Sequence, residues 1–314
     1  MKPIPIWLSV VFAVTSTTAF AQVTSVYEDD KLPVFSVDVA NVDVLFTVTD
    51  RKGKAVRNLK REHFKVYEDG YPQTITTFSA GNSLPLSIAL LVDVSGSVRD
   101  RLKFEQDAAA HFFDSTLVPN KDSGVAMTFD TRVELLQDFT DDAATLARSM
   151  RKMRAGGGTA LFDAVQVAVT RKLKDREGKK ILVIISDGDD TASRTTLVDA
   201  VAAAQRNDVI VYAISTNGSG FWGEKNRRGD DILRKLVEPT GGKVFSPAKA
   251  QDLASNFQDI TQELRYQYGL SYSSTNLARD GGYRRIRVEA SDERYLIRAR
   301  AGYFAPHPPG VAGR

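Results

Sequence analysis

The spacing of apolar residues changes twice along this chain, and these changes predict its organisation. Between residues 35 and 78, apolar positions such as Val42, Val44 and Phe46 nearly alternate with polar ones. Such alternation is typical of half-buried β-strands. From residue 84, short apolar runs take turns with segments of helical spacing, and beyond residue 265 the alternation returns. The pattern predicts strand-rich flanks on either side of a mixed α/β region.

The central region predicts a doubly wound, mainly parallel sheet of the Rossmann-like kind, because buried strands alternate with amphipathic helices. Apolar runs predict strands at residues 86–92, 123–129, 133–136, 181–186, 209–214 and 243–245. Helical spacing predicts helices at residues 99–117, 141–154, 161–176, 195–206, 230–237 and 251–265. Asp230 is expected to cap the helix that it begins.

The flanks predict short strands at residues 64–67, 74–78, 266–272, 283–290 and 295–301, with a turn at 68–72. So few strands are rarely stable alone. We therefore expect both flanks to pair into one β-sandwich with the α/β domain inserted between them; two independent small sheets are the alternative. The expected divisions are a signal peptide (1–21), the N-terminal half of the sandwich (34–82), the α/β domain (84–265), the C-terminal half of the sandwich (266–305) and a flexible tail (306–314).

The start of the chain predicts export. Lys2 precedes a mostly apolar run over residues 6–20, and Ala19-Phe20-Ala21 has the small-x-small form of a signal-peptidase site. Cleavage near Ala21 would deliver the protein to the periplasm or outside the cell; an uncleaved anchor is the alternative. No later segment is long and apolar enough to span a membrane, so no stable membrane insertion is expected after cleavage.

Composition narrows the chemistry further. The chain has no cysteine, which excludes disulfides, thiolate metal sites and cysteine nucleophiles. Its formal net charge of +3 is too small to indicate nucleic-acid binding. The sequence does not indicate an oligomeric state.

The segment after the strand at 86–92 carries the strongest chemical signal. Asp93, Ser95 and Ser97 place oxygen donors at alternate positions, and Gly96 allows a tight turn between them. Hard oxygen donors of this kind suit a divalent cation such as Mg²⁺.

This Asp-x-Ser-x-Ser pattern resembles the metal-ion-dependent adhesion site (MIDAS) of von Willebrand factor type A (VWA) domains. Residues 156–163 resemble the second metal loop of that family, and residues 181–188 resemble the third. The resemblance implies a metal site at the carboxyl end of the sheet, with the ligands Asp93, Ser95, Ser97, Thr159 and Asp187. Residues 48–53, 63–70 and 300–303 in the flanks also resemble the VWA-related family described from acidobacteria.

The resemblance implies a function in adhesion. It implies that one or both carboxylates act through bound water, so they would neutralise the divalent cation incompletely, and an open coordination position would attract a carboxylate from a partner protein. Mg²⁺ suits the few compact ligands best, Mn²⁺ is possible, and Ca²⁺ is less suited because it prefers more ligands. The first alternative is a structural or assembly component of the cell envelope whose metal only stabilises the fold. A metal-dependent hydrolase is a third, lower-ranked alternative.

Several residues near the predicted loops have two interpretations. Asp163, Asp189 and Asp190 could support the metal ligands, or they could stabilise turns and a helix start. Phe221 and Trp222 could contact a partner from a glycine-rich loop, or they could pack back onto the domain. The tripeptide at 228–230 reads Arg-Gly-Asp, but matches of three residues arise by chance.

Catalysis is not expected. Phosphatases of the haloacid dehalogenase type need a carboxylate two residues after the first aspartate, and that position is Ser95. The glycines at 156–158 lack the Gly-Lys-Ser/Thr ending of a nucleotide-binding loop. None of the three histidines lies in a motif with Ser95 or Ser97, so a serine hydrolase is also disfavoured.

Overall fold

The computed structural model describes residues 41–81, 84–99, 102–217, 227–247 and 252–308. The predicted signal peptide, Phe221, Trp222 and most of the predicted tail lie outside these ranges. None of the helices in the described part of the chain is long and apolar enough to cross a membrane.

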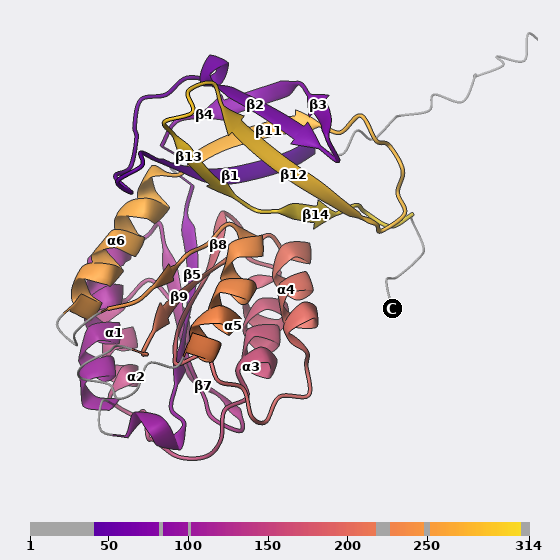
Figure 1. Ribbon diagram of the computed structural model, residues 1–314. Coiled ribbons are helices and arrows are strands. Elements are labelled where there is room, and N and C mark those ends of the chain that lie inside the picture. Colours follow the sequence, from indigo (N-terminus) through magenta and orange to yellow (C-terminus); the bar gives the residue numbers. More distant parts are fainter. Residues whose placement is uncertain (1–40, 82–83, 100–101, 218–226, 248–251, 309–314) are drawn as a thin grey trace, which may run out of the picture. The chain divides into compact units, whose positions relative to one another are not determined.

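A six-stranded sheet forms the centre of the α/β domain (Figure 1). Its strand order is β10-β9-β8-β5-β6-β7, and only the pairing of β6 with β7 is antiparallel. The prediction of a mainly parallel sheet is therefore confirmed. The strands are β5 (Leu86–Asp93), β6 (Ser123–Phe129), β7 (Val133–Thr140), β8 (Lys179–Ser186), β9 (Val209–Ser215) and β10 (Val244–Phe245).

Helices cover both faces of this sheet, as Figure 1 shows. One face packs against α1 (Leu102–Thr116), α2 (Ala143–Met150) and α6 (Asp252–Tyr266), and the other against α3 (Leu161–Val167), α4 (Leu197–Arg206) and α5 (Arg227–Val237). Strand β5 contributes to both cores, with Ile88 and Leu90 in the first and Ala89 and Leu91 in the second. Burial on both faces explains why β5 reads as a nearly continuous apolar run, interrupted only by Ser87 before Asp93.

Several helix boundaries differ from the prediction. Helix α2 starts after Asp142, whose side chain accepts a hydrogen bond from the Thr145 N–H. Helix α3 passes at Ala168 into a π-helical segment, η3 (Ala168–Leu173). Helix α5 already includes Arg227, so Asp230 lies in its first turn and the prediction that Asp230 is the N-cap was wrong. The described residues also include the short helices η1 (Arg61–His63), η2 (Gly96–Val98) and η4 (Glu238–Thr240).

The flanks contain two four-stranded sheets, and each combines strands from both ends of the chain. The first has the order β13-β1-β11-β4 and the second β14-β12-β2-β3. Their strands are β1 (Asn41–Thr49), β2 (Phe64–Glu68), β3 (Tyr71–Gln73), β4 (Ile75–Ser79), β11 (Tyr268–Ser273), β12 (Tyr283–Ala290), β13 (Leu296–Ala299) and β14 (Gly302–Phe304).

Two details of the flanks correct the sequence prediction. Strand β3 was expected to be part of a turn, but its residues pair with β2 across a tight turn at Asp69 and Gly70, which both have positive φ. The strand expected at 295–301 is shorter, because it contains only β13, and the unexpected strand β14 follows it in the other sheet. Period-two alternation does not show where the chain leaves one sheet for another.

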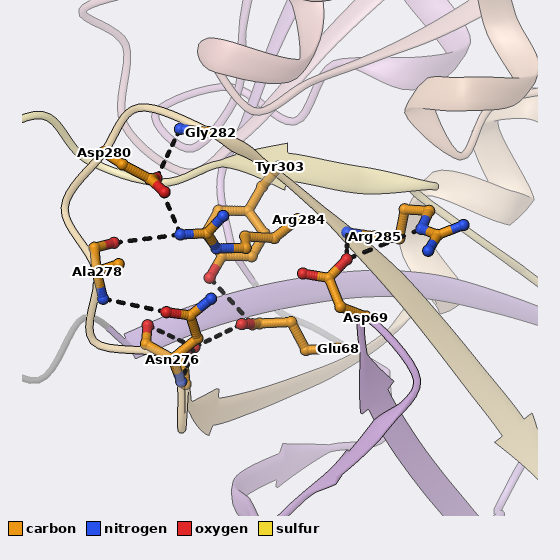
Figure 2. A network of polar contacts seen from close by, with 10 residues as sticks. Glu68, Asp69, Asn276, Ala278, Asp280, Gly282, Arg284, Arg285 and Tyr303 are labelled. Atoms are coloured by element: carbon orange, nitrogen blue, oxygen red, sulfur yellow. Dashed lines mark hydrogen bonds and ion pairs between the residues drawn. The ribbon is translucent and has the colours of Figure 1, made fainter.

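A buried carboxylate links the two sheets. Glu68 of β2 is 2% exposed and accepts hydrogen bonds from Tyr272 (2.8 Å) and Ser274 (2.6 Å). It also accepts a hydrogen bond from Tyr303 (3.0 Å), as Figure 2 shows. Tyr272 belongs to the first sheet, whereas Glu68 and Tyr303 belong to the second. Burial and the negative charge of Glu68 raise the pKa of Tyr303 to about 12, so its hydroxyl stays protonated and donates.

This network predicts energetic coupling between the N-terminal and C-terminal flanks. Glu68→Ala leaves buried hydroxyls without their acceptor, so we expect it to lower the free energy of unfolding by about 2–4 kcal/mol. In a double-mutant cycle with Tyr272→Phe, measured by urea unfolding, we expect a coupling of about 1 kcal/mol or more. Tyr266→Phe provides the control, because Tyr266 is 43% exposed, lies at the end of α6 outside both sheets, and should add independently. A cycle with Tyr272 that is equally additive would contradict the coupling.

Candidate metal centre

The candidate site begins where two neighbouring parallel strands end. Val92 of β5 lies opposite Ile185 of β8, so the next residues, Asp93 and Ser186, are also adjacent. The Ser186 hydroxyl donates a hydrogen bond to Asp93 Oδ2 (2.8 Å), and the Ser95 N–H donates to Asp93 Oδ1 (2.9 Å). Open parallel sheets bind ligands at the carboxyl ends of their strands, where the strand order reverses. The strand order reverses at β5, because β6 lies beside it on one side and β8 on the other.

Asp93 is a buried carboxylate in an unfavourable state. Asp93 is only 1% exposed, and burial raises the pKa of its carboxyl group from 3.8 to about 6. Hydrogen bonds from Ser95 and Ser186 lower this pKa, while the negative charge of Asp187 raises it. A cation bound at Asp93 would favour the charged form and relieve the cost of burial.

The first and second loops are held together by their backbones. The Gly156 N–H donates to the Val94 carbonyl (2.8 Å), and the Gly96 N–H donates to the Gly157 carbonyl (3.1 Å). Gly157 has a φ of +77°, and a Cβ there would lie 2.7 Å from Asp130 Oδ2. The second loop therefore requires glycine at this position.

The predicted hydroxyl donors lie in these same loops. Ser95 is buried and immediately precedes η2. Ser97 lies within η2, and its side chain is outside the described part of the structure. Thr159 is also buried, at the end of the second loop.

The third loop joins the other two. The Thr159 N–H donates to Thr191 Oγ1 (3.0 Å), and the Thr159 carbonyl accepts from the N–H groups of Thr191 (2.8 Å) and Ala192 (3.0 Å). Asp187 directly follows β8, close enough for its charge to act on Asp93. The structure thus brings the three loops to one place.

The neighbouring acids bond to the loop backbone. Asp190 accepts hydrogen bonds from the Phe162 N–H (3.0 Å) and from the Ser193 hydroxyl (2.6 Å). Asp163 accepts from the N–H groups of Arg194 and Thr195; although partial burial alone would raise the pKa of Asp163, these bonds lower it. The Asp189 N–H donates to Asp187 Oδ1 (3.1 Å). These contacts stabilise the chain after the third loop, and support of a metal by these acids remains a prediction.

Sequence reasoning missed four residues that shape the site: Asp130, Ser186, Thr191 and Asn217. Ser186 had a detectable signal, because it is a hydroxyl at the end of a strand expected to lie beside β5. Thr191 and Asn217 follow no spacing rule; they reach the site only because β8, β9 and α3 pack together. Asn217 donates to the Asp187 carbonyl from the end of β9 (2.6 Å).

The donor set suits a hard divalent cation. Side-chain oxygens from Asp93, Ser95, Ser97, Thr159 and Asp187 could hold it, with the two aspartates supplying the negative charge. The described part of the chain has no cluster of three or more His, Cys, Asp or Glu residues able to hold a metal.

The buried charge of Asp93 predicts a pH-dependent stability without metal. The pKa of Asp93 is raised on folding, because the buried carboxyl group is more stable when it is protonated. Its contribution to the free energy of unfolding is therefore fully present below about pH 4 and is lost as the pH rises through about 6. We therefore expect Asp93→Asn, unfolded by urea with chelator at pH 7.5, to be more stable than the wild type by about 1–3 kcal/mol. Asp107→Asn, at an exposed position of α1, is the control and should change little. A metal-free Asp93→Asn protein less stable than the wild type would contradict this.

Comparison with known proteins identifies the domain. Residues 88–189 match the family model described as von Willebrand factor type A domain. A UPF0353 protein of Mycolicibacterium paratuberculosis is 26% identical over 204 residues, covering 57% of this chain and 61% of that protein. An uncharacterized protein of Synechocystis sp. is 20% identical over 186 residues, covering 58% of this chain and 42% of that protein. The chain thus spans less than two thirds of the length of these relatives.

Solved structures show weaker similarity. The conserved hypothetical protein BatB from Bacteroides thetaiotaomicron has a TM-score of 0.47 and 16% identity, covering 57% of this chain and 97% of that one. A von Willebrand factor type A protein from Catenulispora acidiphila has a TM-score of 0.48 and 12% identity, covering 88% of this chain and 76% of that one. Scores below 0.5 add nothing to the family assignment, which depends on the loop sequences and the family match. On that basis, residues 88–189 belong to a von Willebrand factor type A domain.

Proposed function

We propose that this protein is an exported, metal-dependent protein-binding module of the adhesion type. A divalent cation held by Asp93, Ser95, Ser97, Thr159 and Asp187 would capture a carboxylate of a partner protein. The observation that carries the proposal is the burial of the Asp93 carboxylate, with its raised pKa, where the three VWA loops meet.

An open coordination position on the cation would favour an oxygen ligand from a partner. The charges of Asp93 and Asp187 would formally balance a divalent cation, and a carboxylate oxygen of a partner would then complete its coordination. Asp93 is held in place by Ser186 and by the Ser95 N–H, so one ligand is already oriented. Mg²⁺ suits this compact set best, Mn²⁺ is the next choice, and Ca²⁺ is less suited because it prefers more ligands.

A purely structural metal is the second candidate. It is favoured by the same buried carboxylate, because a bound cation would stabilise the fold by removing an unpaired buried charge. We infer no catalytic role, since Ser95 occupies the position where a haloacid dehalogenase-type phosphatase needs its general acid. A metal-dependent hydrolase therefore ranks third.

We further propose that the flanks form one β-sandwich into which the VWA domain is inserted. Three observations support this arrangement: each flank sheet contains strands from both ends of the chain, one cluster of buried residues includes both flanks, and Glu68 bonds across the sheets. The coupling expected between Glu68 and Tyr272 tests it, because independent sheets would show none.

The metal proposal predicts tight uptake of one Mg²⁺ or Mn²⁺ per chain in calorimetry. Thr159→Ala removes a neutral donor, so we expect metal affinity to fall about tenfold or more with little loss of stability. In the Mn²⁺ form, water proton relaxation should report an exchangeable bound water that an aspartate-containing tripeptide displaces.

The outcomes separate the candidates. Asp107→Asn should bind metal like the wild type. Metal uptake without displacement of water by the peptide would favour the structural role, and turnover of a phosphoester or peptide that Asp93→Asn abolishes would favour a hydrolase. No uptake of Mg²⁺ or Mn²⁺ by the folded wild type would overturn the metal site altogether.

Export rests on the sequence at residues 1–21, namely Lys2, the apolar run and the Ala19-Phe20-Ala21 site. Expression in a bacterium with a periplasm should give a mature protein that begins just after Ala21, as measured by intact mass. Ala21→Pro should block cleavage, whereas Ala40→Pro, far from the site, should not. A full-length wild-type protein retained in the cytoplasm would contradict export.

A further inference from the structure

The first turn of α5 packs directly against the third VWA loop. Gly188, which follows Asp187, has a φ of +81°. A Cβ at this position would lie 2.3 Å from the Gly229 carbonyl oxygen and 2.9 Å from Leu233 Cγ. The loop and the helix therefore approach so closely that no side chain fits between them.

A buried carboxylate lies at this contact. Asp230 is 4% exposed, and its Oδ1 atom accepts hydrogen bonds from Ser215 Oγ (2.6 Å) and Asn217 Nδ2 (3.1 Å). Within the described residues no Lys or Arg pairs with it, whereas its exposed neighbour Asp231 pairs with Arg234 (2.7 Å). The Arg-Gly-Asp tripeptide at 228–230 is thus not presented to solvent for recognition.

Asn217 extends this contact to the predicted metal ligand. Its Nδ2 atom donates to the Asp187 carbonyl oxygen (2.6 Å) as well as to Asp230 Oδ1. The Asn217 N–H also donates to Ser215 Oγ (3.2 Å), which itself donates to Asp230. One amide nitrogen therefore joins the Asp230 carboxylate to the backbone of Asp187.

A role in helix stability alone does not account for this burial. An acid in the first turn of a helix is stabilised by the helix dipole, but an exposed acid gains that benefit without losing its hydration. The buried Asp230 instead satisfies donors from the end of β9, and through Asn217 it fixes the orientation of the amide that holds Asp187.

We propose that Asp230 is a positioning residue for the metal centre, acting through Asn217 on the third loop. It orients the Asn217 amide, which fixes the Asp187 carbonyl and so the place of the Asp187 carboxylate before the cation arrives. This inference rests on the proposed function, because it assigns the geometry of the same site. Partners that orient a metal ligand commonly change metal affinity by about 10–100-fold when they are replaced.

The test is Mg²⁺ calorimetry on the full chain, with urea unfolding in chelator as a separate readout. Asp230→Asn should raise the Mg²⁺ Kd about tenfold, because the neutral amide binds Asn217 less strongly. Asp231→Asn, a charge-matched change one residue away, should leave the Kd within about twofold. Asn217→Ala should raise the Kd by a similar factor, and the double variant should lose no more than Asn217→Ala alone, because both residues act in one chain of contacts.

The possible outcomes are distinguishable. If Asp230→Asn lowers metal-free stability but leaves the Kd unchanged, its role is structural and the inference is overturned; additive losses in the double variant overturn the path through Asn217. If Asp230→Asn does not fold, Asn217→Ala alone decides, and an unchanged Kd in that variant rejects the inference. Failure of the wild type to bind Mg²⁺ would instead overturn the proposed function.

Discussion

The candidate site depends on one buried carboxylate at the end of the central strand. Asp93 leaves the sheet where β5 and β8 run side by side, and its two oxygens accept hydrogen bonds from Ser186 and the Ser95 N–H. These bonds orient the carboxylate, but they do not fully offset the cost of burying its negative charge. The pKa of Asp93 is therefore raised. The protein thus holds this carboxylate in a fixed orientation, at a cost in stability when it is charged.

The loops around Asp93 are positioned by close backbone contacts rather than by large side chains. Gly157 has a positive φ that favours glycine, and a Cβ on Gly188 would lie 2.3 Å from the Gly229 carbonyl oxygen, which leaves no room for a side chain. Asp163 and Asp190 then attach the chain after the third loop to the start of α3. As a result, the spacing of the candidate oxygen donors follows from how α3 and α5 pack on the sheet. A change in that packing would move the loops that carry these donors.

The flanks illustrate where sequence patterns lose information. Alternation located the strand regions well, and β2 and β12 lie nearly where they were expected. It did not show that β3 forms a hairpin with β2, nor that a further strand, β14, follows β13 in the other sheet. Glu68, a charged residue in a strand, has no local signal of burial. Its hydroxyl partners come from positions more than 200 residues away in the chain, which only the paired strands bring near.

The sequence by itself determined the elements and the chemistry of the principal donors. Apolar periodicity defines strands and helices because burial imposes it, and the spacing of Asp93, Ser95 and Ser97 after a buried strand is a local feature. The tertiary structure alone decided which acids support the loops, that Asp230 is buried instead of capping α5, and that Ser186 and Asn217 reach the site. These outcomes depend on which strand ends become neighbours, and that depends on the packing of the whole sheet rather than on any one segment.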